Sequence, residues 1–354
     1  MRGVSVLLCV VAASARISVQ ENRSLNGNYR LKLLEHSLNN WAAKVKERNA
    51  FLLARSYAKH RAAMRAKAGH GYFGPLFFQP TFECPVPLVK TTSVATQWDG
   101  GKWMCGLDNI APPCALLSLG SNGDASFEEF VQRRIASRHG AGCTAQIFDP
   151  TIAPPGVPAD AARAFSAGLS PTWKLIETVN PGVPEAALTA IGKRFQSRRG
   201  AVRSGPAVAG LTRFGTLKLI AVSGEGGEPG NRSVKLGAQL YPAMTLREIV
   251  TGMAVRCVDV VKIDVEGSEW DILHTVDWSN VCAGILLFEQ HSNPKFLPAR
   301  HGDYISVGTQ LDYHRKLENA GFRHYMSEAV CPANECTGLQ EQGWVNVTWL
   351  RERL

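Results

Sequence analysis

The chain has 354 residues, of which 45% are hydrophobic and 19% charged, so it can bury the core of one large domain or two small ones. This composition excludes a collagen-like or wholly coiled-coil protein, and no apolar stretch approaches the roughly 18 residues of a membrane-spanning helix. The net charge of +9 is concentrated in residues 16–70. The rest of the chain is nearly neutral, so we expect no nucleic-acid partner.

The first 15 residues have the pattern of a signal peptide. Arg2 supplies a basic start, Val4–Ala13 is apolar, and small residues around Ser14 and Ala15 offer a cleavage site. The apolar run is short for a bilayer, so we expect cleavage after Ala15 and entry into the secretory pathway. A retained Golgi-type anchor is the alternative. The protein is therefore expected to be secreted or to stay in the Golgi lumen.

Outside the signal peptide the chain has eight cysteines, which are Cys84, Cys105, Cys114, Cys143, Cys257, Cys282, Cys331 and Cys336. In an oxidising compartment an even set predicts disulfide bonds, although the sequence does not choose among the pairings. Buried free thiols are the alternative for Cys257 and Cys282, which flank apolar runs. The lack of Cys-x-x-Cys pairs argues against zinc, and no metal site is predicted.

Three Asn-x-Ser/Thr triplets, at Asn22, Asn231 and Asn346, would accept N-linked glycans in the secretory pathway and make the protein a glycoprotein. Asn231 is the best candidate because it follows the turn-rich segment Gly224–Gly230. Asn346 falls in a predicted strand, which is a poorer acceptor position.

Residues 16–73 are predicted to form a basic helical stem. Tyr29–Ala68 contains neither Gly nor Pro, and its apolar residues recur at the three-four spacing of one helix face. The simplest interpretation is a helix that docks on its own domain. Alternatively, its basic residues contact acidic glycans or a membrane surface. A Pro-containing linker at residues 74–97 precedes the main domain at residues 98–354.

Strands alternate with helices in the main domain, which predicts an α/β fold with a mostly parallel sheet. The predicted strands are Ala115–Leu119, Ala145–Phe148, Leu217–Val222, Val258–Asp264 and Gly284–Glu289. The predicted helices are Ser126–His139, Thr245–Thr251, Ser268–Thr275 and Gln310–Ala320. Residues 151–210 are rich in Ala, Gly and Pro, so we interpret them as a mostly loose insertion with one candidate helix at Pro184–Phe195.

Leu116–Phe130, with the sequence LLSLGSNGDASFEEF, combines a strand, a glycine-containing turn and a helix, as nucleotide-binding sites do. Gly120 lets the chain leave the strand sharply, and Gly123 lets the backbone approach a ligand closely. A dinucleotide site would have a further glycine where this chain has Ser118, which disfavours a nicotinamide cofactor. A purely structural turn is the alternative.

Asp149 ends the next predicted strand, 26 residues beyond Gly123. This spacing is close to the roughly 20 residues expected for the acid that binds ribose hydroxyls in a βαβ unit. Asp149 is therefore a predicted cofactor ligand. A carboxylate that starts a turn before Pro150 is the alternative.

The segment Val260–Leu273, VVKIDVEGSEWDIL, places four charged residues after a buried strand: Lys262, Asp264, Glu266 and Glu269. Ligands of an open α/β sheet lie beyond the carboxyl ends of the strands, so Asp264 and Glu266 are predicted site residues. Ser268 and Glu269 are more simply explained as capping and dipole partners of the following helix.

Ile285–His291, ILLFEQH, is a second buried strand that ends in charged residues, Glu289 and then His291. Histidine is a natural general base near neutral pH, although a histidine at a strand end is often a bystander. Both residues are added to the candidate site.

Together these motifs resemble the FkbM-type S-adenosylmethionine methyltransferases. The resemblance rests on SLGSNGDASFE, FDPT, VVKIDVEGSEWDIL, LLFEQH and LENAGF, over roughly residues 98–346 without the insertion. It is closest to a secreted or luminal branch, which shares segments like Gly100–Cys105 and Trp344–Asn346. The family implies a seven-stranded class I methyltransferase fold. It also implies that S-adenosylmethionine is bound by Ser118, Gly120, Ser121, Asn122, Gly123 and Asp149.

The resemblance implies a reaction as well, because FkbM-type relatives methylate hydroxyls of sugars and other small molecules. We therefore expect O-methylation of a glycan or a small molecule. A hydroxyl acceptor needs a base, for which the candidates are Asp264 and His291, with Glu266 and Glu289 holding the base or the acceptor. Ser118 stands where many methyltransferases have an acid that contacts the methionine amino group. A non-catalytic binding module that keeps the fold is the alternative function.

Overall fold

The computed structural model describes residues 27–54, 78–91, 101–121, 126–149, 173–175, 215–218, 221–223, 233–236, 239–253, 255–265, 267–291, 307–330 and 339–354. The predicted signal peptide, the helix at Pro184–Phe195 and the site residues Asn122, Gly123 and Glu266 lie outside these ranges. Within them, no helix combines the length and the apolar character needed to cross a membrane.

The described core is an eight-stranded sheet. In spatial order its strands are β12 (Phe322–Val330), β13 (Leu339–Asn346), β11 (Ala283–His291), β10 (Val258–Ile263), β3 (Ala115–Leu119), β4 (Thr144–Phe148), β6 (Gly215–Lys218) and β5 (Trp173–Leu175). β13 runs antiparallel to the two strands beside it, β11 and β12, and the other neighbouring strands of this sheet are parallel to each other. Every residue of β3, β10 and β11 is buried, as expected for strands covered on both faces.

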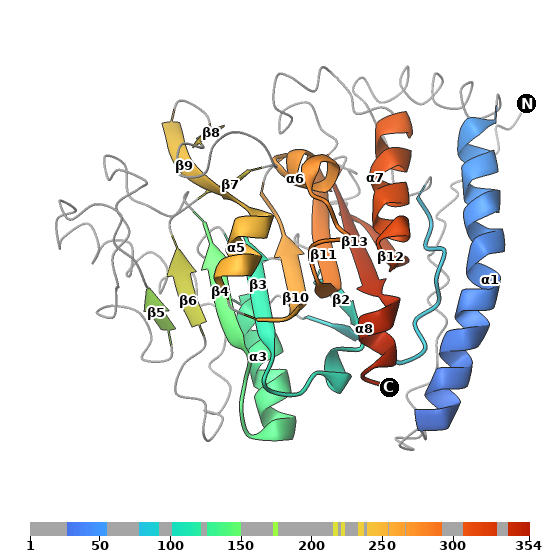
Figure 1. Cartoon of the computed structure of the whole chain (residues 1–354), viewed down its shortest axis with the longest axis horizontal. Coiled ribbons are helices and arrows are strands. Elements are labelled where there is room, and N and C mark those ends of the chain that lie inside the picture. The colour runs from blue at the N-terminus through green and yellow to red at the C-terminus, as the bar shows by residue number, and fades with distance from the viewer. Residues whose placement is uncertain are drawn as a thin grey trace, which may run out of the picture.

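The strand order reverses between β3 and β10. From β3 the sheet continues through β4 to one edge, whereas β10 and β11 lie on the other side of β3 (Figure 1). In doubly wound α/β folds this switch point is where ligands bind, beyond the carboxyl ends of the strands. Gly120 and Asp264, the residues that follow these two strands, are therefore brought to the same place.

Alternate residues of the central strands enter two core layers. One layer contains Leu117 and Val261 and is covered by α5 (Leu246–Gly252), α6 (Glu269–Thr275) and α7 (Val307–Asn319). The other contains Leu116 and Val260 and is covered by β1 (Leu88–Lys90), β2 (Trp103–Cys105), η1 (Leu107–Asn109), α3 (Ser126–His139) and α8 (Val347–Arg351). A three-stranded sheet, β7 (Ala221–Ser223), β9 (Gln239–Thr245) and β8 (Ser233–Leu236), lies apart from the main one.

The predicted alternation of strands and helices is confirmed, with α3 and β3 at their predicted bounds. Two details were wrong. The predicted strand Leu217–Val222 is divided between β6 and β7, which belong to different sheets. The insertion contributes β5, so the sheet has eight strands and not seven. The sequence did not predict β5, because three residues are too few to show the alternation of apolar and polar residues typical of a strand. β5 forms because β6 offers it a parallel partner.

Helix α1 (Gly27–Leu53) docks on its own domain beside α7, as the simpler interpretation expected (Figure 1). Arg48 and Glu318 are both buried, and they form a two-bond ion pair with N–O distances of 2.9 and 3.3 Å. The Arg323 guanidinium lies over the Trp41 ring, 3.6 Å from its centroid. Both contacts use basic residues to attach the helix to the domain.

Two buried histidines lie near this contact. The Arg48 guanidinium can only donate, so His314 Nδ1, 3.2 Å away, must accept and the ring must be neutral. Burial and the charge of Arg48 lower the pKa of His314 and bring the pKa of His324 to about 3. His324 stacks on Trp344, with ring centroids 4.7 Å apart.

We therefore expect acid to destabilise the protein through these histidines. Between about pH 6.5 and 3 the unfolded state binds their protons and the folded state does not, so the free energy of unfolding falls as the pH falls. His324→Phe keeps an aromatic ring against Trp344. It should reduce the slope of the free energy of unfolding against pH by up to about 1.4 kcal/mol per pH unit. Urea unfolding of both proteins between pH 7 and 4 measures this, and equal slopes would contradict it.

Six of the eight cysteines outside the predicted signal peptide form three disulfide bonds, Cys84–Cys105, Cys114–Cys143 and Cys257–Cys282. The alternative of free thiols at Cys257 and Cys282 was therefore wrong. Cys331 and Cys336 lie outside the described residues. Three bonded pairs fit a protein that matures in an oxidising compartment.

Candidate functional site

The turn after β3 is built around Gly120. Its φ angle is +82°, and a Cβ atom there would lie 1.7 Å from the Asp264 carbonyl oxygen. The Gly120 N–H donates to Phe148 O at 2.8 Å, and the Asp264 N–H donates to Leu119 O at 2.8 Å. These bonds draw the ends of β3, β4 and β10 together, so only glycine fits at this position.

Asp149, directly after β4, is bonded to the same turn. Its Oδ2 accepts hydrogen bonds from the Ser121 N–H at 2.7 Å and from the Ser121 hydroxyl at 3.0 Å. Its side chain is buried. The structure thus brings together the predicted cofactor residues Gly120, Ser121 and Asp149 at the carboxyl edge of the sheet.

Ser118 lies one residue inside β3 and is fully buried. Among the described residues, no hydrogen-bond partner is found for its Oγ. It pairs in register with Lys262 of β10. Its predicted contact with the cofactor stays a prediction, as do those of Asn122 and Gly123.

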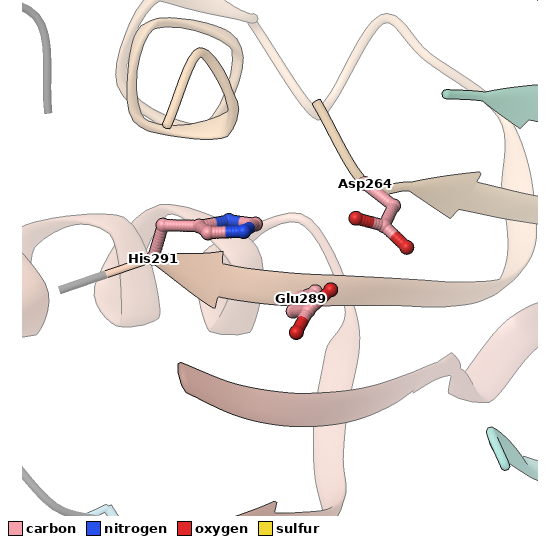
Figure 2. Close-up of side chains that lie close together, drawn as sticks. All are labelled: Asp264, Glu289 and His291. Carbon is pink, nitrogen blue, oxygen red and sulfur yellow. The ribbon is translucent and has the colours of Figure 1, made fainter. Parts of the chain in front are cut away.

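Asp264, Glu289 and His291 gather at the carboxyl ends of β10 and β11 (Figure 2). One donor atom from each lies within 4.8 Å of the others. Glu289 and His291 are buried, and the Asp264 side chain is 17% exposed. Three of the four predicted catalytic residues therefore form one cluster, which we call the acid–histidine cluster.

Glu269, the first residue of α6, holds His291 in place. Its Oε1 accepts from the His291 backbone N–H at 2.8 Å and lies 2.9 Å from His291 Nδ1, while its Oε2 accepts from the Gly267 N–H at 2.7 Å. A carboxylate accepts, so Nδ1 carries a proton and Nε2 bears the lone pair of the neutral ring. The capping interpretation was incomplete for Glu269 and wrong for Ser268, whose side chain makes no cap hydrogen bond.

Two buried lysines complete the site. Lys102 Nζ lies 2.5 Å from Glu341 Oε1 and 3.5 Å from Asp264 Oδ2. Lys262 Nζ donates to the Gly120 carbonyl at 2.6 Å and also lies 3.5 Å from Asp264 Oδ2. Lys262 thereby joins the glycine turn to the acid–histidine cluster.

Sequence reasoning missed Lys102 and Glu341 as site residues. Lys102 lies in the Gly-Gly-Lys-Trp segment that the family resemblance had already singled out, ahead of the first predicted strand. Glu341 stands between two glutamines in β13, and all three are buried. The run of three polar residues shortly before the apolar Trp344 and Val345 was the signal that the sequence offered.

The charges around the cluster set the protonation of its acids. Burial acts to raise the pKa of Asp264, but the ammonium groups of Lys102 and Lys262 outweigh it and keep this pKa below its usual range. Burial, with the charges of Asp264 and Glu341, raises the pKa of Glu289 to about 10. At neutral pH Glu289 is therefore protonated and hydrogen-bonded to ionised Asp264.

Two family models match the chain. The model described as "Methyltransferase domain" matches residues 35–162, which include the Gly120 turn and Asp149. The model described as "Methyltransferase FkbM domain" matches residues 205–323, which include the acid–histidine cluster.

The chain contains an FkbM-type methyltransferase domain. The predicted FkbM-type family and α/β methyltransferase fold are thus confirmed, while the secreted or luminal branch stays a prediction. The family implies a methyl donor of the S-adenosylmethionine type. The first match begins within α1, so the part of this helix from residue 35 onward lies inside the matched range. No curated protein matches the sequence.

Solved methyltransferase-domain structures show only distant likeness. The fibrillarin pre-rRNA processing protein of Methanococcus jannaschii is 9% identical, with a TM-score of 0.31, over 73% of this chain and 81% of that chain. The N-methyltransferase NodS from Bradyrhizobium japonicum WM9 is also 9% identical, with a TM-score of 0.30, over 66% of this chain and 85% of that chain. At these values the likenesses support no argument about this methyltransferase domain.

The described residues of the methyltransferase domain fit a nucleoside cofactor. A backbone without a Cβ at Gly120 and a buried carboxylate at Asp149 lie side by side at the switch point. Such a carboxylate can accept both ribose hydroxyls. The acid–histidine cluster, with two carboxyl groups and one imidazole, has donors that suit either proton transfer or a metal ion.

Proposed function

We propose that this protein transfers a methyl group from S-adenosylmethionine to a hydroxyl of a glycan or a small molecule. The observation that carries the proposal is the contact between the glycine turn and the acid–histidine cluster. Gly120 touches the backbone of Asp264, and Lys262 bonds to both residues. A cofactor at the turn and an acceptor at the cluster would therefore be neighbours.

The chemistry divides between cofactor and protein. S-adenosylmethionine supplies an activated methyl group when bound. Gly120 allows the backbone to approach it closely, and Asp149 is proposed to bind its ribose hydroxyls. The protein then has to align the acceptor and help to remove the hydroxyl proton. We assign this second task to the acid–histidine cluster, where Lys102 and Lys262 keep Asp264 ionised.

Calorimetric titration of the full chain, with its disulfides intact, tests the cofactor half of this proposal. We expect micromolar binding of S-adenosylmethionine and S-adenosylhomocysteine. Asp149→Asn keeps an oxygen that can accept from Ser121 but removes the charge, so it should weaken binding at least about tenfold. Asp312→Asn, an exposed change on α7, is the matched control. Equal affinities in all three proteins would refute the role of Asp149.

A non-catalytic binding module is the second candidate function. It is favoured by Ser118, which replaces the usual acid and is fully buried. Binding of the cofactor without methyl transfer to any glycan or metabolite pool would select the module. Transfer of labelled methyl groups to a hydroxyl would select the enzyme.

We further propose that the protein works in the secretory pathway, and the three disulfide bonds support this location. The exposed lysines of α1, Lys32, Lys44 and Lys46, support the proposed contact with acidic glycans or a membrane surface. Asn346 is a poor glycan acceptor, because its Oδ1 accepts from the Trp349 N–H and caps α8.

A further inference from the structure

We propose that Asp264, Glu289 and His291 bind one divalent cation of the Mn²⁺ type. The binding itself is independent of the proposed function. The role that we give the cation, activation of the acceptor hydroxyl, rests on the proposed function.

The three donor groups are close enough for one ion. Bonds from transition metals to oxygen or imidazole nitrogen are about 2.0–2.2 Å long, so the donors of one ion lie within about 4.4 Å of one another. The donors here lie within 4.8 Å of one another. Small side-chain movements would therefore complete the coordination.

The orientation of His291 is an independent observation that points to a metal. Glu269 holds Nδ1 at 2.9 Å and the backbone N–H at 2.8 Å, which fixes the ring and leaves the lone pair on Nε2. A carboxylate behind a histidine is the usual arrangement around a protein-bound metal, where it fixes the tautomer and raises the basicity of the ligand.

The lysines leave room for the ion. Both Lys102 Nζ and Lys262 Nζ approach the Oδ2 atom of Asp264, each at 3.5 Å. Figure 2 shows an oxygen of Asp264 directed toward His291. One oxygen can therefore face the ammonium groups while the other faces the cation.

The local charge balance also accommodates a dication. Four carboxyl groups, those of Asp264, Glu269, Glu289 and Glu341, surround two ammonium groups in a largely buried region. A cation that displaces the proton of Glu289 would meet two net negative charges, and buried charge is costly unless it is compensated. One divalent cation would compensate it. The mixed carboxylate and imidazole set suits Mn²⁺, which accepts both ligand types.

A bound cation would deepen the proposed reaction. A hydroxyl that coordinates a divalent ion loses its proton more easily, because the metal stabilises the resulting alkoxide. The ion would also orient the acceptor oxygen toward the cofactor turn. His291 then acts as a ligand, and the proton leaves the metal-bound hydroxyl for water.

Electron paramagnetic resonance of Mn²⁺ tests the site without any activity, because the six-line signal of the free ion is lost on binding. For the full chain we expect one Mn²⁺ per molecule. Asp264→Asn and Glu269→Gln keep the side-chain shapes and remove the charge of a ligand and of the group behind His291, respectively, and each should weaken binding about 10- to 100-fold. Glu328→Gln, a partly exposed acid on β12, is the control and should bind normally.

The outcomes separate this inference from the proposed function. Cofactor titration is run on the same samples. Normal binding of S-adenosylhomocysteine with no Mn²⁺ bound would overturn the metal site and leave the methyltransferase proposal standing. Binding of Mn²⁺ by a protein that does not bind S-adenosylhomocysteine would support the metal site and overturn the methyltransferase proposal. Equal Mn²⁺ affinity in the wild type and both site variants would place the ion elsewhere and overturn the assignment.

Discussion

Replacing Arg48 with methionine should lower the free energy of unfolding by about 3–5 kcal/mol. The guanidinium donates hydrogen bonds to both carboxylate oxygens of Glu318, and both side chains are buried. Removing one partner leaves the Glu318 carboxylate without its counter-ion in a poorly hydrated place. The loss therefore comes from an uncompensated charge more than from the missing bond.

Urea unfolding of the full chain measures this effect. Lys46→Met changes an exposed residue of the same helix and is expected to shift stability by less than about 0.5 kcal/mol. The double variant Arg48→Met with Glu318→Met removes both charges and should recover most of the loss. If Arg48→Met is no less stable than Lys46→Met, the buried ion pair does not hold α1 to the domain.

Gly120→Ala should both destabilise the protein and weaken cofactor binding. Alanine at a φ of +82° costs about 1 kcal/mol, and the Cβ would collide with the Asp264 carbonyl at 1.7 Å. Relief of that collision must move the end of β3 or β10 and costs about 1–3 kcal/mol more. Because Asp149 and Lys262 bond to the same turn, we expect cofactor affinity to fall by more than about tenfold.

Gly140→Ala is the matched control for the backbone term. Gly140 has a φ of +73°, but a Cβ there would meet nothing within 4 Å. The Gly140→Ala variant should therefore lose about 1 kcal/mol of stability and keep its cofactor affinity. Thermal melting and calorimetric titration of both variants give the comparison. Similar losses in both variants would show that the close approach of Gly120 to Asp264 is unimportant.

The candidate site could be predicted in part because parallel strands end at a common edge. Asp149 and Asp264 directly follow a strand, and Glu289 is among the last three residues of another, which is visible in the order of apolar and charged residues. Gly120 was equally visible as the break between strand and helix. Local pattern thus predicted which residues reach the carboxyl edge.

The partners of these residues could not be predicted in the same way. Glu269 looked like a helix-capping residue, since a carboxylate in a first turn has that use in many helices. Its bond to His291 spans 22 residues and depends on α6 lying across the end of β11. The division of Leu217–Val222 between two sheets was hidden for the same reason, because both halves have strand-like composition.

By itself, the sequence determined the alternation of strands and helices, the glycine turn and the set of acids at strand ends, because these follow from local periodicity and backbone sterics. Only the tertiary structure decided that Lys102 and Glu341, 239 residues apart, meet beside Asp264. It likewise decided that Arg48 of the stem pairs with Glu318. Such contacts depend on the spatial order of strands and on helix docking, which local patterns do not encode.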